Sequence, residues 1–294
     1  MESQSPPGPS GGRLVVCGVP IGNIGDASER LRVALTEADV VAAEDTRRLR
    51  RLARELGVTV SGRIVSYYDA VEDARTPDLV KAMLDGQVVA LVSDAGMPGV
   101  SDPSFRLVSA CHAQGIPVSV LPGPSAALAA LTISGLPPDR FVFEGFLPRK
   151  AGQRATRLAA LAQEPRTVIL FESPRRTARL LDELVEAFGR DRPAALCREL
   201  TKTHEEVITG TLDDVVAATA GREVLGEVTI VIGGAPTRTV PPAPTELAER
   251  VRRLERDGLA RKDAMRQVAR DAGVPRREVF DALLDASPGD SAGA

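Results

Sequence analysis

The sequence holds 294 residues, of which 43% are hydrophobic and 26% are charged, and its formal net charge is −3. A chain of this length is long enough for two domains with sizeable cores, and the composition is ordinary for a globular protein. The sequence has no run of 18 apolar residues, so we expect no membrane-spanning helix, and the small net charge excludes a protein that is basic throughout.

The cysteines and histidines give no sign of redox chemistry or of a metal site. The three cysteines lie far apart without a C-x-x-C spacing, and neither of the two histidines has a companion at metal-ligand spacing. We therefore expect buried, reduced thiols, as in a cytoplasmic protein, and no metal. These residues are Cys17, Cys111, Cys197, His112 and His204.

The first apolar strand, Leu14 to Val19, runs into a turn rich in glycine and proline. The turn, residues 20–25, matches neither G-x-G-x-x-G nor G-x-x-x-x-G-K-[ST], so it lacks the usual support for dinucleotide or Walker-type nucleotide binding. Asp26 followed by Glu29 has the spacing of a capping box, which predicts that the first helix begins there.

Charged residues follow the second strand, Val40 to Ala43, at its carboxyl end. The sequence there is Glu44-Asp45-Thr46-Arg47, and two acids and a base at the end of a strand are placed to contact a substrate. Asp45 or Thr46 would also cap the following helix, and the two roles are compatible.

Residues 88–126 contain two apolar strands that each enter a loop with glycine and proline and then a helix. The first strand, Val88 to Val92, is followed by a long loop to a helix that begins near Ser104. The second strand, Pro117 to Leu121, is followed by a stiff loop to an alanine- and leucine-rich helix. Ligands of open parallel sheets bind beyond the carboxyl ends of the strands, so two such loops on neighbouring strands predict one binding cleft.

Strand and helix patterns alternate in two successive regions, which predicts two α/β domains. The first domain, residues 13–135, ends after a helix from Ser125 to Ser134, and residues 136–150 form an interdomain connection that lines the cleft. The second domain is residues 151–234, with a sheet that we expect to be mixed. Eight arginines and lysines against two glutamates between residues 146 and 180 favour a partner with a phosphate backbone.

A proline-rich linker, residues 235–245, precedes a small helical module, residues 246–286. Gly273 is expected to end one helix of this module before Pro275 begins the next, as in a helix-turn-helix. Such a module serves equally well as an RNA contact or as a packing or dimer element.

The two ends of the chain are polar and rich in glycine, serine and proline. Residues 1–12 lack the basic start and the apolar core of a signal peptide. We therefore expect a disordered leader at residues 1–12 and a disordered tail at residues 287–294.

Seven short motifs resemble, in their order, the ribosomal RNA small subunit methyltransferase I family, which belongs to the tetrapyrrole-methylase superfamily. The resemblance spans roughly residues 13 to 290. Met97, where the family commonly has threonine, and Ser104, where it commonly has glycine, are small departures that affect only loop geometry. The motifs are Pro20-Ile21-Gly22-Asn23-Ile24-Gly25-Asp26, Ala43-Glu44-Asp45-Thr46-Arg47, Ser93-Asp94-Ala95-Gly96-Met97-Pro98, Leu121-Pro122-Gly123-Pro124-Ser125-Ala126, Phe143-Glu144-Gly145-Phe146-Leu147-Pro148, Phe171-Glu172-Ser173-Pro174-Arg175-Arg176 and Arg198-Glu199-Leu200-Thr201-Lys202.

The resemblance implies two α/β domains of the tetrapyrrole-methylase type (class III methyltransferase), with the cofactor in the interdomain cleft and the helical module appended. It implies S-adenosyl-L-methionine as the cofactor and a homodimer as the assembly. The implied reaction is methylation of the 2′-oxygen of a decoding-centre cytidine in 16S rRNA of the small ribosomal subunit. Cofactor contacts carry over to Pro20, Met97, Val100, Ser125, Ala126, Glu172, Leu200 and Thr229.

A base that takes the proton of the 2′-hydroxyl would assist this reaction, and Glu44, Asp45 and Glu199 are candidates. Lys202 would serve as the base only with a lowered pKa, and otherwise it would bind phosphate. Tyr67 and Tyr68 would stack on a base if exposed, or pack in the core if buried. The expected phosphate contacts are Arg47, Lys150, Arg154, Arg175 and Arg176.

Two other functions remain open from the sequence. A relative that methylates a tetrapyrrole, a corrin or another small acceptor would share the cofactor loops, but it would not need the basic stretch or the C-terminal module. A non-catalytic RNA-binding assembly factor would retain the fold without transferring a methyl group. None of the three functions requires a membrane partner.

Overall fold

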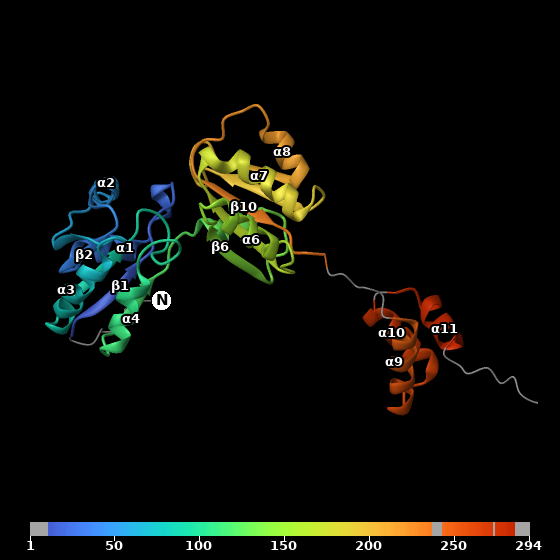
Figure 1. Cartoon of the computed structure of the whole chain (residues 1–294). Helices are drawn as coiled ribbons and strands as arrows, with labels where there is room; N and C mark the ends of the chain where they lie inside the picture. The colour runs from blue at the N-terminus through green and yellow to red at the C-terminus, as the bar shows by residue number, and fades with distance from the viewer. Residues whose placement is uncertain (1–10, 237–242, 273, 286–294) are drawn as a thin grey trace, which may run out of the picture. The chain divides into compact units, whose positions relative to one another are not determined.

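The computed structural model describes residues 11–236, 243–272 and 274–285 of the chain. The chain divides into two compact units, Met1–Ala235 and Pro236–Ala294. The first unit holds two five-stranded sheets with their helices, and the second holds three helices (Figure 1). The predicted fold class, two α/β sheets followed by a helical module, is therefore confirmed. The expected tail, and most of the expected leader and linker, lie outside the described residues.

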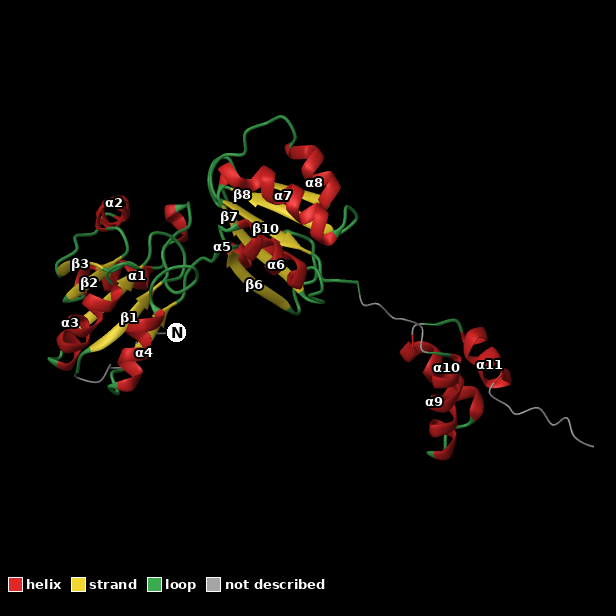
Figure 2. Cartoon of the chain, viewed as in Figure 1, coloured by secondary structure: helices red, strands yellow, loops and turns green. Residues whose placement is uncertain are grey.

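The first sheet is parallel throughout, with strand order β3-β2-β4-β1-β5. Its central strands carry continuous apolar sequences because helices cover both faces of the sheet (Figure 2). β1 lies between β4 and β5, so the two loops that we expected on neighbouring strands are separated by the loop that follows β1. The strands are β1 (Arg13–Cys17), β2 (Val40–Ala43), β3 (Arg63–Ser66), β4 (Val88–Val92) and β5 (Val118–Leu121).

Two helices pack on each face of this sheet. Leu31 and Leu49 belong to the apolar cluster on one face, whereas Leu79 and Leu107 belong to the cluster on the other. Tyr67 is fully buried in the second cluster, and its hydroxyl lies 3.0 Å from that of Thr76, whereas Tyr68 is exposed. The helices are α1 (Glu29–Glu37) and α2 (Thr46–Leu56) on the first face, and α3 (Glu72–Leu84) and α4 (Phe105–Ala113) on the second.

The caps of α1 and α2 show how the sequence starts these helices. The predicted capping box at Asp26 is wrong, because Asp26 belongs to a short 3-10 helix, Ile24–Asp26. Ser28 caps α1 instead, and its hydroxyl accepts a hydrogen bond from the Leu31 amide at 3.1 Å. Asp45 caps α2 as expected, through a 2.8 Å bond from the Arg47 amide.

The second sheet is mixed, as predicted, with strand order β6-β7-β10-β8-β9 and one parallel pair, β6 with β7. β6 lies inside the segment that we expected to be an interdomain connection. An irregularity in the pairing at Gly145, whose φ is +71°, bends this strand at the edge of the sheet. The strands are β6 (Phe141–Phe146), β7 (Thr167–Glu172), β8 (Pro193–Arg198), β9 (Glu206–Thr211) and β10 (Val228–Ile232).

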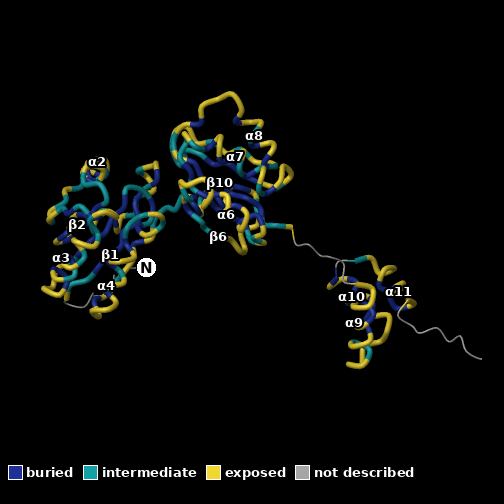
Figure 3. Tube along the Cα trace, viewed as in Figure 1, coloured by how far each residue is buried: buried dark blue, intermediate teal, exposed yellow. Residues whose placement is uncertain are grey.

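The helix α5 (Ala126–Ile133) packs on the second sheet, although we expected it to end the first domain. Its buried Ala127, Ala130 and Leu131 form one cluster with residues of β7, β8 and β10. The loop after β5 therefore leads directly from the first sheet to the second. The other face is covered by α6 (Ala151–Leu161), α7 (Pro174–Phe188) and α8 (Leu212–Thr219), as the buried strands between the helices show (Figure 3).

The second unit is a bundle of three short helices with its own apolar core, which includes Val251, Met265 and Val279. The helices form where the apolar periodicity predicts them, and Pro244 occupies the first turn of α9, where a missing amide donor costs least. Gly273, the predicted helix end, lies outside the described residues. The helices are α9 (Pro244–Arg256), α10 (Arg261–Ala272) and α11 (Arg276–Asp285).

The core of the first sheet gives a test of this packing. Leu91 on β4 is 1% exposed, so Leu91→Ala should lower the free energy of unfolding by about 2–5 kcal/mol through lost apolar burial and the cavity left behind. Leu84→Ala is the matched control, since Leu84 at the end of α3 is 59% exposed. Urea unfolding measures both variants, and equal losses would contradict this assignment of the core.

Candidate active site

Three loops meet at the carboxyl ends of β1, β4 and β5. Val19 and Gly96 exchange two backbone hydrogen bonds, of 2.9 and 3.2 Å, which join the loop after β1 to the loop after β4. The Gly123 amide donates to the Met97 sulfur at 3.3 Å and so joins the loops after β4 and β5. These bonds hold the three loops together as one platform.

Glycine is required at two positions where the loops touch. A Cβ at Gly123 would lie 2.8 Å from the backbone of Gly18, and a Cβ at Gly18 would lie 2.6 Å from the Gly123 amide. Both distances are shorter than real Cβ contacts, so any side chain would push the loops apart. This close contact explains the glycine of the Leu-Pro-Gly-Pro-Ser-Ala motif.

A cavity of about 370 Å³ lies between this platform and the second sheet. Its size falls within the range of roughly 300–1,000 Å³ that is typical of small-molecule sites. One wall is the loop after β4, and the opposite wall includes Phe146, Phe171 and Thr229 of the second sheet. Phe146 and Phe171 pack edge to face with ring centres 5.7 Å apart, which gives this wall a rigid apolar surface.

Six of the eight residues predicted to bind the cofactor line this cavity. Ser125 and Ala126 at the start of α5 are small, which leaves room beside them. Pro20 lines a neighbouring cavity instead, and Leu200 is 7% exposed within the apolar cluster under α5. The six residues are Met97, Val100, Ser125, Ala126, Glu172 and Thr229.

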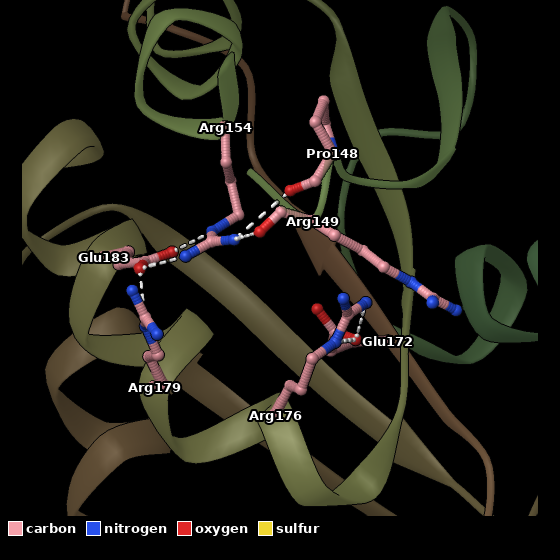
Figure 4. Close-up of polar contacts among 7 residues, drawn as sticks. All are labelled: Pro148, Arg149, Arg154, Glu172, Arg176, Arg179 and Glu183. Carbon is pink, nitrogen blue, oxygen red and sulfur yellow. Dashed lines mark hydrogen bonds and ion pairs between the residues drawn. The ribbon is translucent and has the colours of Figure 1, made fainter. Parts of the chain in front are cut away.

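Glu172 is one of the acids that line this cavity, and hydrogen bonds hold its carboxylate. Its carboxylate accepts bonds from the Ser173 amide at 2.6 Å and from Arg176 Nε at 2.8 Å. Its side chain is buried, so the pairing with Arg176 compensates for the loss of hydration (Figure 4). Arg176 is a predicted phosphate contact, but part of its guanidinium already donates to Glu172 within the protein.

A second cavity of about 300 Å³ shares Ile21, Ala95 and Glu227 with the first. Its lining is more charged and includes Arg48, Asp94 and Lys202. Two adjoining cavities, one largely apolar and one charged, suit a reaction between a cofactor and a polar acceptor.

Two predicted catalytic acids end β2, and both bond to the loop after β4. The Asp94 amide donates to Glu44 Oε2, and the Asp45 amide donates to Asp94 Oδ1, each at 3.0 Å. Burial raises the pKa of Glu44. Hydrogen bonds from Arg47 hold the pKa of Asp45 well below its usual range, so Asp45 is a poor proton acceptor at neutral pH.

The other two predicted catalytic residues, Glu199 and Lys202, neutralise each other. Lys202 Nζ lies 2.7 Å from Glu199 Oε1 and 3.2 Å from Glu227 Oε2. The hydrogen bond from Lys202 lowers the pKa of Glu199. Burial lowers the pKa of Lys202, but its bonds to Glu199 and Glu227 outweigh burial and raise it. Lys202 therefore stays charged and does not meet the condition for acting as a base.

The backbone of this segment is strained. Glu199 and Thr201 both have positive φ values, +51° and +66°, which non-glycine residues rarely adopt. The strain is maintained by contacts across the site, because the Thr201 hydroxyl accepts a 3.0 Å bond from the Asn23 amide in the loop after β1. The loop after β8 is thereby tied to the platform.

Sequence reasoning missed Asp102, which also lines the first cavity. Burial is the largest cause that raises its pKa, to about 7, and the negative charge of Glu44 is the next. The Ser-Asp-Pro sequence after the glycine loop was the available signal, but burial and neighbouring carboxylates cannot be read from it.

The predicted phosphate contacts differ in how far they are free to meet a ligand. Arg154 is 8% exposed, and its guanidinium bonds to both oxygens of Glu183 and to the carbonyls of Pro148 and Arg149 (Figure 4). It therefore fixes the loop before α6 instead of reaching outward. Arg175 and Lys150 are exposed, and Arg47 is exposed but pairs with Asp45 at 2.7 Å.

The fold and the cleft define a class of methyltransferases. A family model described as tetrapyrrole (corrin/porphyrin) methylases matches residues 13–216. The methyltransferase CobJ has the same fold, with a TM-score of 0.58 and 22% identity over 77% of this chain and 96% of that chain. A uroporphyrin-III-C-methyltransferase from Thermus thermophilus gives a TM-score of 0.53 at 23% identity, covering 75% and 94%.

Curated relatives narrow the class further. "Ribosomal RNA small subunit methyltransferase I" of Mycobacterium tuberculosis is 50% identical over 277 residues, 94% of this chain and 95% of the relative. The protein of the same name from Synechocystis is 42% identical over 275 residues, 93% and 98% of the two chains. The chain belongs to the ribosomal RNA small subunit methyltransferase I family within the tetrapyrrole methylases, and it is a methyltransferase. The family resemblance of the motifs is confirmed.

The contact between Gly18 and Gly123 can be tested by substitution. Gly123→Ala should weaken binding of S-adenosylmethionine at least tenfold, because the added Cβ would force apart the loops that shape the cavity. Isothermal titration measures the affinity, and the melting temperature reports whether the fold survives. Gly152→Ala on α6 is the control, since a Cβ there meets no atom within 4 Å. Unchanged affinity in Gly123→Ala would contradict the role of this contact.

Proposed function

We propose that the protein transfers a methyl group from S-adenosylmethionine to the 2′-oxygen of a decoding-centre cytidine in the 16S rRNA of the small ribosomal subunit. The observation that carries the proposal is the 50% identity, over 94% of the chain, to a relative named for methylation of small-subunit ribosomal RNA. The paired cavities at the carboxyl edge of the first sheet support it independently.

The first cavity fits S-adenosylmethionine in size and chemistry. Its apolar walls suit the adenosine, and the buried carboxylate of Glu172 together with loop backbone suits the polar groups. The bound cofactor supplies a methyl group on a positively charged sulfur. Met97, Val100, Ser125 and Ala126 would hold it from the platform side, and Thr229 from the second sheet.

The second cavity suits the acceptor nucleotide. Arg48 and Lys202 line it, and although Arg48 lies 3.5 Å from Asp94 and Lys202 lies 2.7 Å from Glu199, both are donors suited to a phosphate oxygen close to the reacting ribose. Holding the two reactants in adjoining cavities replaces an encounter in solution by a fixed alignment. This is the largest contribution to this kind of transfer, and it lowers the activation free energy by about 7–11 kcal/mol. The hydrogen bond from the Asn23 amide to the Thr201 hydroxyl keeps the Lys202 side of this cavity in place, despite the positive φ values of Glu199 and Thr201.

We also propose a homodimer in the cytoplasm as the working form, on the family resemblance. None of the described helices is long and apolar enough to cross a membrane. Sedimentation equilibrium of the purified chain tests the assembly, and a single species of 31.1 kDa would contradict the dimer.

The decisive experiment offers labelled S-adenosylmethionine with small subunits that lack the modification, with naked 16S rRNA, and with a uroporphyrin-type small acceptor. Label on a single cytidine of the subunits, with a bond that resists alkaline cleavage, is the expected result. Label on the small acceptor alone would support a tetrapyrrole or corrin methylase instead. Cofactor binding without transfer to any acceptor would favour an assembly factor.

Exposed cations beside the cleft should contribute to RNA affinity. Lys150→Ala and Arg175→Ala should each weaken binding of small-subunit RNA and reduce the slope of log affinity against log salt by about 1, because each change removes one phosphate contact. Arg190→Ala is the control, since Arg190 pairs with Asp213 and precedes the amino end of β8, whereas Glu199 of the site follows its carboxyl end. Filter binding at several salt concentrations provides the slopes. Equal slopes in all variants would remove Lys150 and Arg175 from the interface.

A further inference from the structure

Phe146 at the end of β6 lines the first cavity, yet it is not among the cofactor contacts that the family resemblance implies. The residue is 56% exposed, so a large part of an aromatic ring meets water in the wall of a cavity. A ligand that covered this ring would gain the free energy of apolar burial.

A bulge in β6 determines where this ring lies. Residues three apart in a regular strand point to opposite faces of the sheet, but Phe143 and Phe146 both pack edge to face on Phe171, with ring centres 5.0 and 5.7 Å away. The irregularity between Phe143 and Gly145 adds one residue to the strand and so brings both rings to the same face. A Cβ on Gly145 would lie 3.1 Å from the Ser101 hydroxyl oxygen, so the glycine at the bend also lets the loop after β4 approach.

The chain that follows Phe146 is held as well. Leu147 is 3% exposed and belongs to the apolar cluster under α6 and α7. Arg154 then donates to the carbonyls of Pro148 and Arg149, at 3.2 and 3.0 Å (Figure 4). Phe146 therefore presents its ring from a fixed backbone, and little conformational freedom is lost when a ligand packs on it.

Phe146 is also the aromatic ring of this wall with the most surface left for a ligand. Phe171 packs against both Phe143 and Phe146, and it is only partly exposed. The wall across the cavity contains Met97 and Val100 of the loop after β4. A flat ring would thus lie between an aromatic surface and aliphatic side chains.

The position of Phe146 selects the adenine among the parts of the cofactor. The transferred methyl group must face the acceptor, and the two cavities meet at Ile21, Ala95 and Glu227. Phe146 lines the first cavity alone, so its ring lies outside the part where the sulfur must be placed. The adenine is planar and uncharged, and an aromatic ring binds such a heterocycle by stacking.

We propose that Phe146 is a cofactor-binding residue whose ring stacks on the adenine of S-adenosylmethionine. This inference rests on the proposed assignment of the first cavity to the cofactor and of the second to the acceptor. It names the side chain that binds the adenine. The carboxylate, ammonium and sulfonium of the cofactor then lie away from Phe146, which has no group to bond to them.

The test is the affinity for S-adenosylhomocysteine, which has the adenine but no sulfonium charge, measured by isothermal titration without RNA. Phe146→Leu keeps an apolar side chain but loses the stacking surface, so it should weaken binding by at least about fivefold. Phe146→Tyr keeps the ring and should bind like the wild type. Phe141→Leu is the matched control and should also bind like the wild type, because Phe141 begins the same strand and is 38% exposed but does not line the cavity.

A second readout reports contact directly. The chain contains no tryptophan, so Phe146→Trp introduces a single indole. Adenosine should quench its fluorescence because the two rings stack, whereas methionine at the same concentration should leave it unchanged. Phe141→Trp should respond to neither compound.

Three outcomes would overturn the inference. Wild-type affinity in Phe146→Leu would show that the ring does not contact the cofactor. A loss for S-adenosylmethionine but not for S-adenosylhomocysteine would place the ring against the sulfonium instead. Quenching of Phe146→Trp by single-stranded RNA but not by adenosine would assign the ring to the RNA-binding surface.

These readouts need no methyl transfer, so they separate this inference from the proposed function. A wild type that methylates no RNA would overturn the proposed function, and the expected losses and quenching would still support the role of Phe146. A wild type that methylates the small subunit while Phe146→Leu binds the cofactor unchanged would overturn only the role of Phe146.

Discussion

The contact between three loop backbones at the carboxyl edge of the first sheet determines the rest of the site. Gly18 and Gly123 approach so closely that neither has room for a Cβ, and Val19 and Gly96 exchange hydrogen bonds beside them. Because α5 starts directly after the third loop and packs on the second sheet, the same contact also fixes where the second sheet meets the platform. The cavity between them is a consequence of this chain path.

The acids of the site are divided by whether a cation accompanies them. Asp45, Glu172 and Glu199 each have an arginine or lysine within 2.7 Å. Glu44, Asp94 and Asp102 lie near one another with Arg48 as their neighbouring cation, and burial is the largest cause that raises the pKa of each. Paired acids hold loops in place, whereas acids crowded together retain the ability to bind a proton. Residue type alone does not reveal this difference.

The sequence was sufficient for the fold class because central strands such as β2 and β4 are continuous apolar runs and the turns contain glycine and proline. The family resemblance of its motifs placed six of the eight expected cofactor contacts around one cavity. The sequence failed where a tertiary contact overrides a local pattern: Ser28 caps α1 instead of Asp26, and β6 occupies a segment that resembles a connection. Asp102 was missed for the same reason, since its pKa depends on neighbours that are distant in sequence.

The basic stretch between residues 146 and 180 shows why a local charge count overstates an RNA-binding surface. Five of its eight cations form ion pairs, including Arg154 with Glu183 and Arg176 with Glu172. Arg154 is the clearest case, because its donors hold two backbone carbonyls and Glu183. Ion pairing is weak at exposed sites, so these arginines still add positive potential near the cleft. Three exposed cations of the stretch have no ion pair among the described residues, and these are Arg149, Lys150 and Arg175.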